Sequence, residues 1–116
     1  MRKKGNDGEL IAKKYLMKHG FNILKTNYYT RYGELDIIAQ NGNRIHVVEV
    51  KLSNSNTISS GYKINRKKRK RMIYCTYYFM DRFGFQNYYY QFDLITITDN
   101  QIKHVENIFS LNDVFQ

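Results

Sequence analysis

The stretch GELDIIAQNGNRIHVVEVK, residues 33–51, constrains the fold more than any other part of the chain. Two runs rich in β-branched residues flank Asn41-Gly42, a dipeptide typical of two-residue hairpin turns. The sequence therefore predicts an antiparallel β-hairpin. Each run also carries acidic residues within a segment that would otherwise be apolar, and these charges require an explanation.

The acids of the predicted hairpin fall in phase with one another. Glu34 and Asp36 share one face of the first strand, because side chains alternate between faces. Glu49 and Lys51 share one face of the second strand for the same reason. The predicted turn sets Asp36 opposite Val47 and Glu34 opposite Glu49. Asp36 and Glu49 then become diagonal neighbours, about 7 Å apart.

Carboxylates that face one another repel unless a cation lies between them. Mg²⁺ (or Mn²⁺) binds oxygen ligands from one or two carboxylates together with water, so Asp36, Glu49 and Glu34 are candidate metal ligands. Lys51 could stabilise a metal-bound hydroxide or the charge that develops on a phosphate. Phosphodiester hydrolysis requires such groups. The alternative is an exposed strand face on which Glu49 and Lys51 form only a surface ion pair.

A helix is predicted ahead of the hairpin. Asn6 or Asp7 can cap its start, and it is expected to run to about His19 and to stop at Gly20. Glu9 lies on the apolar stripe of this helix and should approach the hairpin acids. The alternative is that Glu9 only completes a capping box with Asn6.

The remaining segments complete an α/β pattern. The sequence predicts a strand or bent strand pair over 21–32, a polar mobile loop over 53–61, a helix over 62–82, a strand over 88–98 and an edge strand over 102–107. The order of helix, three strands, helix and further strands predicts one domain over residues 1–116, with a mixed sheet flanked by helices.

The net charge of +9 predicts a polyanionic partner, for which nucleic acid is the usual candidate. Seven of the nine residues from Lys63 to Arg71 are basic. The candidate DNA-binding residues are Lys63, Arg66, Lys67, Lys68, Lys70 and Arg71. Lys68 falls on the stripe that faces the sheet, whereas its neighbours are expected to face phosphates. A solvated helix face is the alternative.

The chain has one cysteine, Cys75, which excludes an intrachain disulfide and fits a reducing compartment. No apolar run approaches the ~18 residues that cross a bilayer, and the first residues lack the apolar region of a signal peptide. We therefore expect a cytoplasmic protein with no membrane partner. His19, His46 and His104 stand isolated in the sequence and are not predicted to be ligands.

Six tyrosines in or beside the predicted strands have two possible roles. They are expected to pack within the sheet, with stacking on unpaired bases as the alternative. These residues are Tyr28, Tyr29, Tyr32, Tyr88, Tyr89 and Tyr90.

Taken together, the segments 5–51, 64–80 and 91–97 resemble the YraN family of small bacterial proteins. That family is similar to Holliday-junction resolvases and falls within the PD-(D/E)xK nuclease superfamily. The resemblance implies a restriction-endonuclease-like fold and a metal-dependent endonuclease that acts on DNA, including branched or damaged DNA. The catalytic and metal-binding residues that it implies are Glu9, Glu34, Asp36, Glu49 and Lys51. Lys68 matches a lysine that opens the family's second long helix.

Two positions depart from the family pattern. Leu52 and Ser53 stand where an arginine usually follows the lysine, and Gln91 stands where an arginine usually precedes Phe-Asp. These changes are expected to weaken phosphate contacts or an ion pair with Asp93. They leave open a catalytically weak or inactive nucleic-acid-binding module of the same fold. Symmetric cleavage of a junction would in addition require a homodimer.

Overall fold

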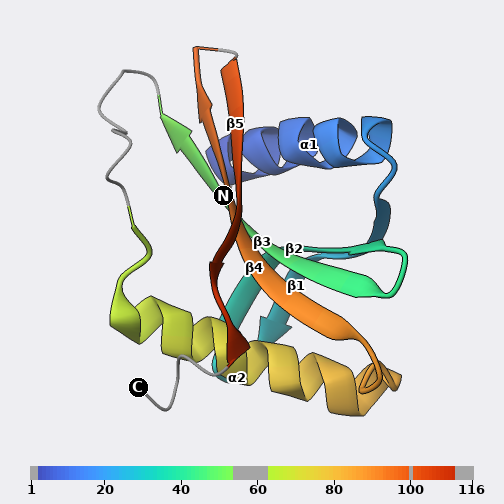
Figure 1. Ribbon diagram of the computed structural model, residues 1–116. Helices are drawn as coiled ribbons and strands as arrows, with labels where there is room; N and C mark the ends of the chain where they lie inside the picture. Colours follow the sequence, from blue (N-terminus) through green and yellow to red (C-terminus); the bar gives the residue numbers. More distant parts are fainter. Residues whose placement is uncertain (1–2, 54–62, 100, 112–116) are drawn as a thin grey trace.

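Two helices cover opposite faces of one five-stranded mixed sheet (Figure 1). The computed structural model describes residues 3–53, 63–99 and 101–111. In chain order the elements are α1 (Lys3–Lys18), β1 (Asn22–Thr30), β2 (Gly33–Asn41), β3 (Arg44–Ser53), α2 (Arg66–Phe83), β4 (Tyr89–Thr98) and β5 (Gln101–Phe109). The strands lie in sequence order, with β3 and β4 parallel and the other neighbours antiparallel. The predicted α/β architecture is confirmed and is consistent with a restriction-endonuclease-like fold.

Each face of the sheet carries its own apolar core, and β3 contributes to both. Val47 packs in the core that α2 covers, together with Phe79, while Val48 packs beneath α1 with Leu16. A strand buried on both faces needs apolar residues at successive positions. This explains why the second run of the hairpin reads almost continuously apolar up to Glu49.

The helix α1 begins earlier than predicted. It starts at Lys3, so Asn6 and Asp7 lie inside the helix and the predicted cap is wrong. Packing explains the difference, because a Cβ built on Gly8 would lie 3.3 Å from the Leu52 side chain. The helix therefore packs closely on β3 at Gly8, and tertiary packing of this kind can override the local capping preference of a sequence. The stop is as predicted, with Gly20 in the left-handed region at a φ of 89°.

The hairpin has an even loop, as expected, but its register differs from the prediction. Asn41 pairs with Arg44, so the two-residue loop is Gly42-Asn43 rather than Asn41-Gly42. Val47 lies opposite Ile38 instead of Asp36. The predicted pairing was therefore wrong by two residues. A shift of two keeps every side chain on its predicted face.

The helix α2 starts at Arg66 rather than at residue 62. Asn65 caps it from an extended conformation, and its side chain accepts a hydrogen bond from Lys68 N at 2.8 Å. Of the loop predicted over 53–61, Ser53 is the last residue of β3 and residues 54–61 lie outside the described residues. Within the described chain, neither helix is long and apolar enough to span a bilayer.

The histidines are not isolated, which corrects the interpretation from sequence. On the α1 side of the sheet, Asp93 Oδ2 accepts hydrogen bonds from His46 Nδ1 at 2.7 Å and from His104 Nε2 at 2.8 Å. Its other oxygen accepts from Gln91 Nε2 at 2.9 Å and from Asn107 N at 3.0 Å. Burial opposes ionisation of this carboxyl, but the four donors outweigh it and hold the pKa of Asp93 below its usual range.

This network, defined by His46, Gln91, Asp93, His104 and Asn107, joins the three strands β3, β4 and β5. The β4–β5 pairing shifts register between Phe92 and Leu94, opposite Asn107, which has a φ of 56°. At this bulge the Asn107 N–H donates to the side chain of Asp93 on β4 rather than to a backbone carbonyl. Asp93 therefore fixes both the bulge and the last strand.

We expect Asp93→Asn to lower the free energy of unfolding by about 2–4 kcal/mol, because an amide N–H₂ would face donors at a fully buried position. Chemical denaturation at pH 7 measures this. Asp81→Asn, at an exposed position of α2, is the matched control and should change stability little. A pKa held low stabilises the fold above the unfolded value of 3.8, so the wild-type advantage should shrink as pH falls below that value. Equal stabilities of the two variants would contradict this role.

Candidate active site

The candidate site forms where β2 parts from β3. The paired register of the hairpin ends at Ile37 and Val48. Beyond that point the Val50 N–H donates to Asp36 Oδ2 at 2.9 Å, so a side-chain carboxylate takes the place of a backbone carbonyl. This bond fixes Asp36 between the diverging strands. Continuing the register would set Asp36 directly opposite Glu49, closer than the predicted diagonal.

Glu49 lies beneath the first turn of α2 and is only 5% exposed. Its carboxylate forms an ion pair with the ammonium of Lys68, which is half-buried. The two residues belong to the lining of a pocket of about 190 Å³. That pocket is lined by Gly33, Glu34, Asp36, Glu49, Lys68, Arg71 and Met72. The structure therefore brings together three of the predicted acids and Lys68.

Glu9 approaches the same acids from α1. It is 8% exposed, and oxygen atoms of Glu9, Glu34 and Asp36 all lie within 4.8 Å of one another. The capping-box alternative placed Asn6 at the helix start, whereas Asn6 lies within α1. Three carboxylate oxygens at this separation match the oxygen donors that Mg²⁺ or Mn²⁺ prefers, so these residues could hold such an ion.

Asn27 is a site residue that the sequence analysis missed. Its amide nitrogen donates to Glu9 Oε1 and, at 2.9 Å, to Glu34 Oε2. The residue lies within β1 but has a φ of 51°, in the left-handed region. Asparagine tolerates this left-handed conformation better than most residues, so an asparagine inside a strand-like segment was the available signal.

The electrostatics of the site disfavour the ionised form of Asp36 in the absence of a cation. Burial, and then the charge of Glu49, raise the pKa of Asp36 to about 7. The Val50 N–H and Lys68 act in the opposite direction but are outweighed. A bound cation would reverse the balance, because it favours the ionised form of every carboxylate that touches it.

Lys51 lies on β3, two residues beyond Glu49, as predicted. It is exposed on β3, and the described residues that line the pocket do not include it. The ammonium that contacts Glu49 belongs to Lys68, on α2. The structure thus places Lys68 beside Glu49, while the catalytic role of Lys51 stays a prediction.

The other candidate DNA-binding residues face solvent, as expected, whereas Lys68 faces the sheet. Lys63 precedes α2 and is exposed, and Arg66, Lys67, Lys70 and Arg71 are exposed along its first turns. Arg71 both reaches solvent and lines the pocket. The basic surface therefore begins at the rim of the carboxylate site.

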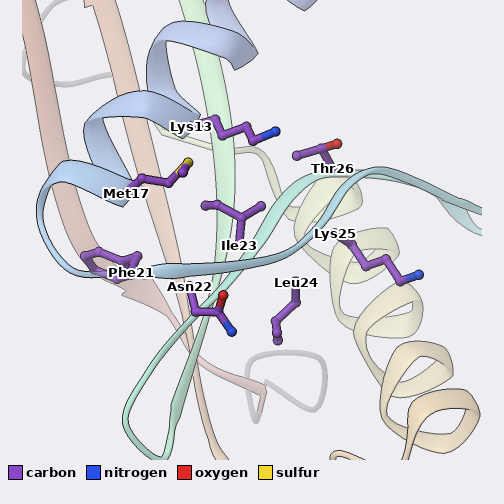
Figure 2. Close-up of a pocket in the computed structure, with 8 residues that line it drawn as sticks. All are labelled: Lys13, Met17, Phe21, Asn22, Ile23, Leu24, Lys25 and Thr26. Atoms are coloured by element: carbon purple, nitrogen blue, oxygen red, sulfur yellow. The ribbon is translucent and has the colours of Figure 1, made fainter.

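A groove between α1 and the edge strand β1 leads toward Glu9 of the site. Figure 2 shows Lys13 and Met17 of α1 above the β1 residues, with Lys25 near one end. This hollow has a volume of about 480 Å³, and an adjoining one of about 290 Å³ extends to Glu9 and Asn27. The groove therefore leads along the edge of the sheet to the carboxylates.

A second group of potential metal donors lies on the α1 face of the sheet, whereas Glu49 lies on the α2 face. His46, Asp93 and Glu106 have donor atoms within 4.8 Å of one another. Hydrogen bonds from N–H groups already occupy both oxygens of Asp93, however. The arrangement is explained without an ion, and we assign it a structural role.

Comparison with known proteins places this geometry in a family context. A family model described as "Uncharacterised protein family UPF0102" matches residues 8–97. A UPF0102 protein of Campylobacter fetus is 36% identical over 90% of this chain and 91% of its own length. A UPF0102 protein of Clostridioides difficile is 38% identical over 93% of this chain and 97% of its own length. A third, from Thermodesulfovibrio yellowstonii, is 36% identical, with coverage of 90% and 94%.

The raised pKa of Asp36 predicts a pH-dependent response to divalent ions. Between the unfolded value of 3.8 and the folded value of about 7, the folded state holds the extra proton, so the stability of the ion-free protein should fall as pH rises through this range. Mg²⁺ competes with that proton and should raise the melting temperature more at pH 8 than at pH 5.5. Asp36→Asn should abolish the difference. An equal effect of Mg²⁺ at both pH values in the wild type would contradict the assignment.

Proposed function

This chain belongs to the uncharacterised protein family UPF0102, and we propose that it is a metal-dependent endonuclease that cleaves DNA phosphodiesters in the cytoplasm. The observation that carries the proposal is the convergence of Glu9, Glu34, Asp36 and Glu49 at the point where β2 and β3 diverge. Branched or damaged DNA is the substrate that the sequence resemblance favours.

The donor set of the site suits Mg²⁺ or Mn²⁺. All of its potential ligands are carboxylate oxygens, which are the donors that hard divalent ions select over imidazole or thiolate. Asp36, Glu49 and Glu9 would hold the ion, with Glu34 beside them. When bound, the ion would polarise a phosphate oxygen and lower the pKa of a water molecule.

The protein's own residues would orient the reaction. Asn27 donates to Glu9 and Glu34 and so fixes the direction of both carboxylates. Lys68 would supply positive charge beside Glu49, where charge develops on the phosphate during displacement. Arg71, at the rim of the same pocket, would hold a neighbouring phosphate.

The basic first turns of α2 support DNA as the partner. Like charges crowded on one helix repel one another, and polyanion binding removes that cost. These side chains would contact the backbone of the duplex without reading its sequence. The net charge of +9 acts in the same direction.

A DNA-binding module without catalytic activity is the second candidate. The observation that favours it is the ion pair between Lys68 and Glu49, which gives Glu49 a positive partner without a metal ion. An assay of DNA cleavage distinguishes a nuclease from a module that only binds DNA, whereas an assay of DNA binding does not.

The first test is cleavage of linear, flapped and four-way DNA in Mg²⁺ or Mn²⁺. We expect cleavage that EDTA abolishes and that Glu49→Gln lowers by about 10²–10³-fold, since the amide cannot neutralise a cation. Asp7→Asn, at an exposed position of α1, is the matched control and should retain activity. Binding of DNA by a wild-type protein that leaves every substrate intact would favour the module without catalysis.

The second test measures DNA affinity as a function of salt. Replacing Lys67, Lys70 and Arg71 with alanine should weaken binding to all sequences alike and flatten the salt slope by about 3. The control replaces three exposed lysines elsewhere, Lys14, Lys18 and Lys103, and so removes equal charge. Similar slopes in the two triple variants would mean that DNA does not bind along α2.

A further inference from the structure

The outer face of α2 changes from basic to aromatic along its length. Beyond Lys70 and Arg71, the same face carries Tyr74, Tyr77 and Tyr78, which are 41%, 40% and 44% exposed. Positions three and four residues apart lie on one side of a helix, so the tyrosines continue the basic stripe. They are distinct from the strand tyrosines, of which Tyr28 packs against Phe79 in the core.

The aromatic part of this face adjoins the carboxylate pocket. Arg71 lies next to Gly33, where a Cβ would be 3.9 Å from the Arg71 side chain, and both residues line the pocket. One residue before Gly33, the ring of Tyr32 lies 5.5 Å from that of Tyr74. The guanidinium of Arg31 lies 5.2 Å from the Tyr32 ring centre. We call Arg31, Tyr32, Tyr74 and Tyr78 the tyrosine platform.

We propose that the tyrosine platform stacks unpaired bases, so that the substrate class of the neighbouring site is duplex DNA that carries unpaired nucleotides beside the scissile phosphate. The inference rests on the proposed function. Exposed aromatic rings stack on bases of any sequence, because every base offers a π-face. In a continuous duplex the bases already stack on one another and cannot reach such rings. The platform therefore has a use only where bases leave the stack.

The positive charge of this face favours nucleic acid as its binding partner. The exposed residues Lys67, Lys70 and Arg71 precede the exposed rings along α2, and Arg31 lies against Tyr32. A surface of this charge opposes contact with a second copy of itself. A nucleic acid strand offers both phosphates for the basic residues and π-faces for the rings. The order along α2 sets the duplex over the basic turns and the unpaired bases over Tyr74 and Tyr78.

The test compares binding in EDTA, where cleavage cannot occur, of a plain duplex and of the same duplex with three unpaired nucleotides. One unpaired base is 2-aminopurine, whose fluorescence falls on stacking. We expect the wild type to prefer the unpaired DNA and to quench the probe. Tyr74→Ala should lose about tenfold in affinity for that DNA alone, with the quenching abolished, and Tyr74→Phe should keep both.

Tyr89→Ala is the matched control, because Tyr89 is 65% exposed and pairs with Arg44 at the start of β3, five residues before Glu49. The centre of its ring lies 5.6 Å from the Arg44 guanidinium. It should behave as the wild type. Equal affinity of the wild type for the two DNAs without quenching would overturn the inference and leave the nuclease proposal standing. Absence of binding to either DNA would overturn both. A dimer that Tyr74→Ala converts to a monomer in sedimentation, with DNA binding unchanged, would assign the face to self-association and overturn the inference.

Discussion

The hydrogen bond from the Val50 N–H to the Asp36 carboxylate is the interaction on which the site depends. It ends the β2–β3 pairing without leaving a buried donor unsatisfied, and so allows the two strands to separate. The separation leaves room for Glu9 to enter from α1 and for Lys68 to enter from α2. Both helices therefore reach a site that a regular hairpin would have closed.

The sequence predicted this region well for a reason that lies in strand geometry. The register of the hairpin was wrong by two residues, yet Asp36 and Glu49 still share a face, because the alternation of side chains has a period of two. Periodicity likewise placed Lys68 toward the sheet and Lys67 toward solvent. The local pattern correctly predicted which face each side chain occupies. It did not predict the start of α1, and this helix packs against β3 where Gly8 approaches Leu52, a residue distant in the sequence.

The contacts of Asp93 could not be predicted, because they join three strands. His46 and His104 are separated by half of the chain and meet only once β3 and β5 flank β4. The departure at Gln91 was expected to weaken an ion pair with Asp93. In the structure Gln91 itself donates to Asp93, and the two imidazoles provide further donors. Asp93 is thus satisfied by Gln91 of its own strand and by donors from the two neighbouring strands.

Asp93 and Asp36 belong to the same sheet, but one has a structural role and the other lies in the candidate active site. Asp93 has four donors for its two oxygens, and these keep its pKa low despite burial. Asp36 has one backbone donor and faces the Glu49 carboxylate, so burial raises its pKa to about 7. A carboxylate whose oxygens already accept several hydrogen bonds from the protein has few lone pairs free for a ligand. A carboxylate whose ionised form is destabilised by burial and a neighbouring acid gains stability when it binds a cation. This difference in partners, more than burial itself, distinguishes the candidate active site from the network that holds β5.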